Sequence, residues 1–131
     1  MIKVSEHREL IDSIFERYDL SASCYEIVPD VREWCEKNGI SEANPFRGAK
    51  CLCRASNGTF HILFKEEQSD EMISCAKSTM ELYGFVNEVK KLDSDLKYLE
   101  HLILHEISCK LLNETEQKPR DEWAFKEMGI I

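Results

Sequence analysis

Hydrophobic positions recur at the three- and four-residue spacing of helices in several segments of the chain. The first stripe consists of Ile11, Ile14, Phe15 and Tyr18. It predicts a helix over about residues 5–18 that packs on a core through one face. Asp30 then fits the N-cap of a short second helix, with Glu33 as its capping-box partner and Gly39 at its left-handed end. Trp34 is expected to anchor that helix.

The middle of the chain alternates between apolar and polar positions, which predicts a β-hairpin around the turn signal Asn57-Gly58. The expected pairs are Ser56 with Thr59, Ala55 with Phe60, Cys53 with Ile62, and Cys51 with Phe64. One face then carries Cys51, Cys53, Ala55, Phe60, Ile62 and Phe64, and it is predicted to be core. The opposite, wetter face carries Lys50, Leu52, Arg54, His61, Leu63 and Lys65. Buried cysteines usually behave as small hydrophobes, so the Cys51-x-Cys53 pair is interpreted as core packing.

Three further helices are predicted in the second half of the chain. Ser69 fits the N-cap of one over about residues 69–83, and Gly84 suits its end. The next runs over about residues 94–112. It is apolar around most of its circumference, so it should be largely enclosed. The last begins near Pro119, which suits a first helical turn.

These elements predict an α+β fold. The fold should be mostly helical, with an antiparallel hairpin or small sheet packed on the buried helix over about residues 94–112. The 131 residues fit one domain of ordinary size. The sequence shows neither a repeat nor a Pro/Gly/Ser-rich linker, so residues 1–131 are predicted to form a single domain.

Composition argues against several classes of function. The 25 acidic and 17 basic residues give a net charge of -8, which disfavours binding to nucleic-acid phosphates. No apolar run approaches the roughly 20 residues that span a bilayer, and the charged N-terminal segment is unlike a secretory signal. We therefore expect a cytoplasmic protein that is not embedded in a membrane. In that compartment the six cysteines should be reduced thiols.

The most informative motif lies in the helix over about residues 94–112. Its segment His105-Glu106-Ile107-Ser108-Cys109 follows the zinc-peptidase pattern His-Glu-x-x-His, with cysteine in place of the second histidine. Two ligands four residues apart lie about 6 Å apart along the helix axis, so both can reach one zinc ion. Glu106 could then act as the general base on zinc-bound water during peptide hydrolysis.

Cys109 changes the chemistry that this motif favours. A thiolate can ligate zinc, but its negative charge weakens the metal as a Lewis acid, so binding is favoured over hydrolysis. His101 and His105 form an alternative ligand pair, also four residues apart. His101 and Cys109 cannot both join His105 on one ion, because they are separated by about 12 Å of helical rise. Cys109 and His105 could instead act as nucleophile and base, although no sequence signal supplies an oxyanion hole.

The hairpin, the His105-Glu106 helix and the later segment 120–125 together resemble the small zincin-like metallopeptidases of the ImmA/IrrE type. That segment reads Arg120-Asp121-Glu122-Trp123-Ala124-Phe125. The resemblance covers roughly the last two thirds of the chain in order of elements, and few residues by identity. It implies a strand layer over the motif helix, zinc bound through His105, Glu106 as the general base, and cleavage of a protein such as a repressor.

The chain departs from the family pattern at two of its three ligands. Cys109 stands where the second ligand histidine belongs. In the family, a Glu-Ala-x-x-Phe-Ala pattern gives the third ligand, and aligning Trp123-Ala124 with Phe-Ala places Pro119 at the glutamate. Residues that could replace this glutamate, if the last helix is shifted, are Glu116, Asp121 and Glu122. The candidate zinc ligands are therefore His105, Cys109 and Asp121.

The sequence thus predicts a degenerate zincin-like domain that binds a protein partner or peptide substrate. It is expected to be noncatalytic or weakly metal-binding rather than a competent protease. The alternative is a protein-interaction or regulatory module without metal, in which His101 and His105 serve hydrogen bonds in the core. Metal content distinguishes the two hypotheses.

Overall fold

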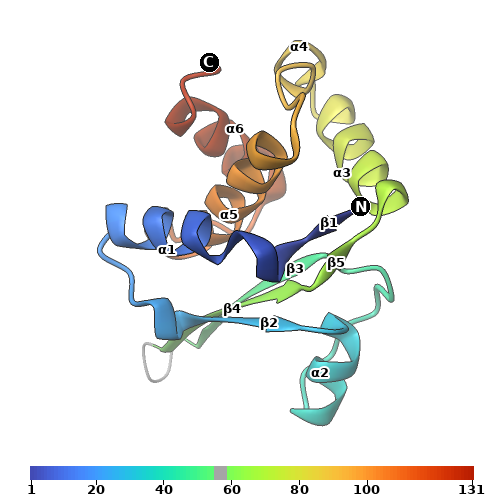
Figure 1. The fold of residues 1–131 in the computed structure, drawn as a ribbon, viewed down its shortest axis with the longest axis vertical. Helices are drawn as coiled ribbons and strands as arrows, with labels where there is room; N and C mark the ends of the chain where they lie inside the picture. Colours follow the sequence, from blue (N-terminus) through green and yellow to red (C-terminus); the bar gives the residue numbers. More distant parts are fainter. Residues whose placement is uncertain (55–58) are drawn as a thin grey trace. The chain divides into compact units, whose positions relative to one another are not determined.

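The computed structural model describes residues 1–54 and 59–131, which form two compact units, Met1–Met72 and Ile73–Ile131 (Figure 1). The single domain over residues 1–131 stays a prediction. Helices predominate and a small sheet is present, which confirms a mixed α+β composition. The packing of the hairpin on a zincin-like helix stays a prediction. None of the helices in the described ranges is long and apolar enough to cross a membrane.

The first unit contains both sheets of the described chain. Its elements are β1 (Ile2–Lys3), the 3-10 helix η1 (Val4–His7), α1 (Arg8–Arg17), η2 (Ala22–Cys24), β2 (Tyr25–Val28), α2 (Val31–Lys37), β3 (Ala49–Arg54), β4 (Thr59–Lys65) and β5 (Glu67–Gln68). One sheet has the order β2-β4-β3, with β2 parallel and β3 antiparallel to β4. In the other, β1 and β5 pair antiparallel. The sequence predicted only the β3–β4 hairpin.

The two predicted N-terminal helices are present, the first of them divided into η1 and α1. Phe15 of α1 is fully buried, and the ring of Tyr25 meets it edge-on at 5.1 Å between centroids. At the start of α2, Asp30 Oδ1 accepts a hydrogen bond from the Glu33 backbone N–H at 2.8 Å, as expected of an N-cap. Gly39 follows α2 with a φ of 70°, the left-handed conformation that favours glycine.

The register predicted for the β3–β4 hairpin is wrong by two residues. Cys51 lies opposite Ile62 and Cys53 opposite Phe60, where the prediction has Phe64 and Ile62. The reason is the connection between the strands, because Thr59 pairs with Arg54 rather than with Ser56. The predicted turn at Asn57-Gly58, with Ser56 and Ala55, lies outside the described residues. An even shift does not exchange the two faces of a strand, and the side chains of Phe60, Ile62 and Phe64 are buried as expected.

The face predicted to be wetter is apolar along part of its length. Leu63 of β4 is fully buried there, and Leu52 of β3 is partly buried. They belong to a cluster with β2 and α2 whose other members are Val28, Val31, Trp34, Cys35 and Ile40. This prediction was wrong because β2 and the packing of α2 on this face depend on contacts that the local pattern does not encode.

The second unit is helical. Its elements are most of α3 (Asp70–Leu82), α4 (Val86–Val89), α5 (Asp95–Leu111) and α6 (Gln117–Glu127). The three helices expected here are confirmed, and the short α4 was missed. Ser69 Oγ accepts a hydrogen bond from the Met72 N–H at the start of α3, and Ser94 Oγ accepts one from the Lys97 N–H at the start of α5.

Helices α5 and α6 lie side by side and form the core of this unit (Figure 1). The fully buried apolar residues of α5 are Leu99, Ile103, Leu104 and Ile107, and those of α6 are Ala124 and Phe125. Burial of each leucine, isoleucine or phenylalanine side chain contributes about 1.5–3 kcal/mol. The predicted enclosure is confirmed for the middle of α5, residues 98–109, whereas Leu96, Leu111 and Leu112 near its ends are exposed. Polar side chains buried on the middle of α5 need partners within the protein.

Candidate metal centre

Three side chains that can ligate a metal meet between α5 and α6. His101 and His105 come from successive turns of α5, and Asp121 comes from α6. Their ligand atoms all lie within 4.8 Å of one another. His101 is 2% exposed and Asp121 5% exposed, and the side chain of His105 is 12% exposed. Within residues 1–54 and 59–131 this is the one group of three such side chains.

The local structure explains why these residues converge. Side chains four residues apart project from the same face of a helix, so the two imidazoles are neighbours, 6.3 Å apart between ring centroids. The ring of His101 packs on Phe125 of α6 at 4.3 Å between centroids. Asp121 is four residues before Phe125, so the same face of α6 supplies the packing contact and the carboxylate.

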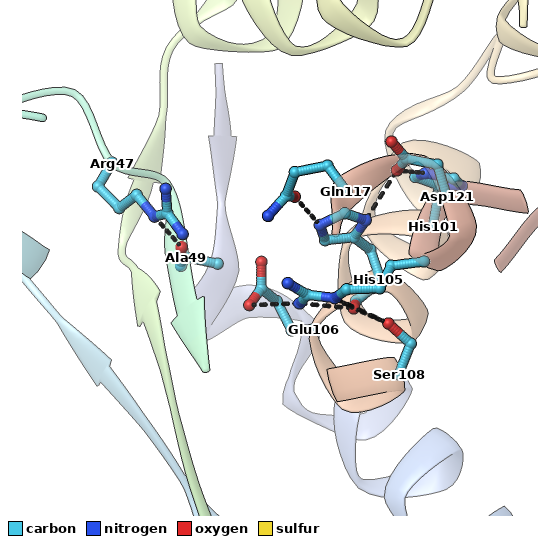
Figure 2. Close-up of polar contacts among 9 residues, drawn as sticks. Arg47, Ala49, His101, His105, Glu106, Ser108, Gln117 and Asp121 are labelled. Carbon is cyan, nitrogen blue, oxygen red and sulfur yellow. Dashed lines mark hydrogen bonds and ion pairs between the residues drawn. The ribbon is translucent and has the colours of Figure 1, made fainter. Parts of the chain in front are cut away.

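One carboxylate oxygen contacts both histidines (Figure 2). Asp121 Oδ1 lies 3.0 Å from His101 Nε2 and 2.7 Å from His105 Nδ1. The first contact has hydrogen-bond geometry, whereas the second, although shorter, lacks the alignment of a hydrogen bond. The remaining nitrogen of His105, Nε2, lies 2.6 Å from Gln117 Oε1. Nδ1 of His101 is buried and has no hydrogen-bond partner among the described residues.

Burial and the histidines together set the charge of this cluster. Burial by itself would raise the pKa of Asp121, but the hydrogen bond from His101, the close contact with His105 and the charge of both imidazoles reverse this and lower the pKa to about 2. Burial also lowers the pKa of His101, an effect that Asp121 only partly opposes. Nearby, burial and then the negative charges of Asp121 and Glu106 raise the pKa of Tyr98. At neutral pH the cluster therefore contains an ionised carboxylate beside an uncharged His101.

The structure groups two of the three predicted ligands. His105 and Asp121 lie together, and the third member of the group is His101, from the alternative His101–His105 pair, rather than Cys109. Cys109 is partly buried, and its sulfur is disulfide-bonded. The expectation that all six cysteines are reduced thiols is therefore wrong, because this sulfur is not a thiol.

Glu106, the predicted general base, belongs to a different buried network on the same two helices. Its Oε2 lies 3.5 Å from Arg120 Nη2. The Arg120 guanidinium also donates to the His105 carbonyl oxygen at 2.9 Å and to Ser108 Oγ at 3.0 Å. Ser108 Oγ donates to the same His105 carbonyl. Glu106 is not a member of the His101–His105–Asp121 group, and its catalytic role stays a prediction.

The other candidate replacements for the third ligand lie elsewhere on α6. Glu116 is exposed at the N-cap, and Glu122 pairs with Lys126 at 3.0 Å. Sequence reasoning missed Gln117, because a half-buried glutamine carries no recognisable pattern. The His101-x-x-x-His105 spacing did signal the histidine pair, but the rotation of α6 that brings Asp121 to it has no local signature.

Comparisons with known proteins provide no family for this chain. No protein-family model, no curated protein and no solved structure matches it. The resemblance to zincin-like metallopeptidases of the ImmA/IrrE type therefore stays a prediction.

Proposed function

We propose that this chain is a zincin-like, noncatalytic metal-binding domain that acts by binding a protein or peptide. Its centre would be a single divalent transition-metal ion, preferably zinc, held by His101, His105 and Asp121. Imidazole nitrogen and carboxylate oxygen are both zinc ligands, and two histidines with one carboxylate also suit iron(II). Three protein ligands leave at least one coordination position for water or for a group from the partner.

The contact between His105 Nδ1 and Asp121 Oδ1 is the observation that carries this proposal. The two atoms are 2.7 Å apart without the alignment of a hydrogen bond. Without a proton on Nδ1, two lone pairs would face one another at this distance, which is unfavourable in a buried site. One cation that ligates both atoms removes this repulsion. Ligand atoms that each lie about 2 Å from one zinc ion are themselves roughly 3 Å apart. The two contacts of Asp121 Oδ1 are close to that spacing.

The charge of the cluster supports the same proposal. Metal ligands bind in their deprotonated forms, that is, as carboxylate and neutral imidazole. The low pKa of Asp121 and the lowered pKa of His101 keep both groups in these forms at neutral pH. Within residues 1–54 and 59–131 the two histidines are the ion-pair partners of Asp121. A bound cation would add positive charge beside this carboxylate.

Leu102 supports metal binding without peptide hydrolysis. In the motif His-Glu-x-x-His, the general base directly follows the first histidine. When His101 and His105 are taken as the two motif histidines, that position is Leu102, which cannot accept a proton. Glu106 follows the second histidine, and its recorded partner is Arg120. The ligand set is therefore present without the carboxylate that peptide hydrolysis requires at this position.

A metal-free interaction module is the second candidate, and one contact favours it. His101 Nε2 and Asp121 Oδ1 are 3.0 Å apart, an ordinary length for a hydrogen bond that stabilises a core. His101 Nδ1 lacks a partner in both candidates, because the metal would bind to Nε2 of this ring. The misaligned contact between His105 Nδ1 and Asp121 Oδ1 is therefore what favours the metal centre over the interaction module.

Metal content of protein purified without a histidine tag tests the proposal. We expect close to one zinc per chain after reloading and dialysis, and loss of that zinc in His105→Ala. The control is His61→Ala, which removes a partly exposed histidine outside the group and should leave the zinc unchanged. Wild-type protein with less than about a tenth of a zinc per chain would reject the metal centre in favour of the interaction module, because formed sites bind tightly.

A further inference from the structure

We infer that Gln117 is a positioning residue that selects which nitrogen of His105 faces the metal. This inference rests on the proposed metal centre. Gln117 lies four residues before Asp121 on α6, so both side chains project from the same face of this helix. The imidazole of His105 lies between them, with one nitrogen toward each (Figure 2).

The hydrogen bond to Gln117 defines the tautomer of His105. An amide oxygen accepts hydrogen bonds and cannot donate them, so the 2.6 Å contact with Gln117 Oε1 requires a proton on His105 Nε2. In a neutral imidazole the other nitrogen then carries the lone pair. That nitrogen is Nδ1, the atom 2.7 Å from Asp121 Oδ1.

The opposite orientation of the Gln117 amide fits the contacts less well. It would place the NH2 group against His105 Nε2, which would then have to accept, and would move the ring proton to Nδ1. That proton would have to be donated to Asp121, but the contact between Nδ1 and Asp121 Oδ1 lacks hydrogen-bond alignment. The oxygen of Gln117 therefore faces the ring, and the lone pair of His105 faces the metal site.

The two histidines consequently offer different nitrogens to the site. His101 presents Nε2 toward Asp121, whereas His105 presents Nδ1. His101 Nδ1 has no hydrogen-bond partner in the described part of the chain, so Gln117 is the one side chain there with a recorded bond to the outer nitrogen of either imidazole. Such an outer hydrogen bond orients the ring and raises its basicity, and losing it typically costs 10–100-fold in metal affinity.

Two measurements on full-length protein test this inference. Long-range 1H–15N spectra of metal-free protein report the tautomer of His105 directly, and competition with a chelator gives the zinc dissociation constant. We expect the Nε2–H tautomer in the wild type and a mixture of tautomers in Gln117→Leu, which has no acceptor. Zinc affinity should fall about 10–100-fold in Gln117→Leu and be retained in Gln117→Glu, which keeps an oxygen acceptor.

Lys118→Ala is the matched control, because Lys118 is the exposed neighbour of Gln117 on α6. It should change neither measurement. An Nδ1–H tautomer in the wild type, or equal zinc affinities of the wild type and Gln117→Leu, would overturn the inference. A wild type that binds no zinc would overturn the proposed function instead, and the spectra of metal-free protein would still decide whether Gln117 sets the tautomer. If Gln117→Leu does not fold, the wild-type spectrum and Gln117→Glu carry the test.

Discussion

Two buried polar clusters lie on the same pair of helices, and they differ in how fully their members satisfy one another. In the Arg120 cluster, the guanidinium donates to a backbone carbonyl, a hydroxyl and the carboxylate of Glu106. The positive charge of Arg120 thus lies beside the negative charge of Glu106, and the guanidinium donors have acceptors. In the His101–His105–Asp121 group, a single carboxylate oxygen serves two imidazoles, one contact is misaligned, and one nitrogen has no partner among the described residues.

This difference separates a structural cluster from a candidate ligand set. Both clusters are similarly buried, so burial alone does not distinguish them. The two clusters differ in their partners: each donor of the Arg120 cluster has an acceptor, whereas in the Asp121 group two imidazoles share one carboxylate oxygen and His101 Nδ1 has no partner among the described residues. If the comparison holds, changes in the first cluster alter stability, and changes in the second alter metal binding.

Arg120→Met should have the largest effect. It leaves Glu106 buried without its recorded partner, and breaking a buried pair in this way costs about 3–5 kcal/mol of unfolding free energy. Urea denaturation measures the change. The double variant Arg120→Met/Glu106→Leu should recover part of the loss, because it also removes the buried charge. A change below about 1 kcal/mol, the range of exposed pairs, would mean that this pair is not a structural element.

Asp121→Asn should have the next largest effect, and it should appear in metal binding. The amide keeps the size of the side chain but removes the charge that the site offers a cation. We expect zinc affinity to fall more than about 100-fold, equivalent to about 3 kcal/mol, as measured by chelator competition. The comparison between the clusters would fail if Asp121→Asn retained affinity within a few fold of the wild type.

The pH dependence of metal-free protein should show a smaller effect of the same residue. The folded-state pKa of Asp121 is about 2 and its ordinary value is 3.8, so its ionised form favours folding. This contribution, about 2 kcal/mol, is complete above pH about 4 and is lost as pH falls toward 2. Denaturation at a series of pH values should therefore show that the free energy of unfolding falls less steeply with acid in Asp121→Asn than in the wild type. The same dependence of this free energy on pH in both proteins would contradict the lowered pKa of Asp121.

Ser94→Ala should have the smallest effect and should leave the metal untouched. Ser94 caps α5, and removing such a cap costs about 1 kcal/mol. Thermal denaturation should detect this loss, while the zinc content per chain stays the same. Loss of zinc in this variant would show that metal binding in the other variants reports general stability rather than the ligands.

Features encoded by neighbouring residues were predicted well from the sequence. The caps Asp30 and Ser69 and the enclosed middle of α5 depend on spacing within one helix, and all are present. The β2 strand was missed, because four residues paired in parallel with β4 leave no local alternation or turn signal. The hairpin register was wrong because it depends on the length of the connection.

The same distinction applies to the candidate site. The spacing of His101 and His105 was visible in the sequence as an alternative pair. Asp121 was identified as a candidate only on condition that the last helix was shifted, since its position depends on how α6 rotates against α5. Gln117 could not be identified, because its significance comes from one contact between the two helices.

Leu102 has a consequence for how such a centre could evolve or be redesigned. Replacing this one leucine with glutamate would put a carboxylate directly after the first histidine of the pair, the order found in hydrolytic zinc helices. The present leucine offers nothing that can abstract a proton from a coordinated water molecule. Water on a metal held here would lack a base in this position to activate it, and the chain could bind a peptide without cutting it.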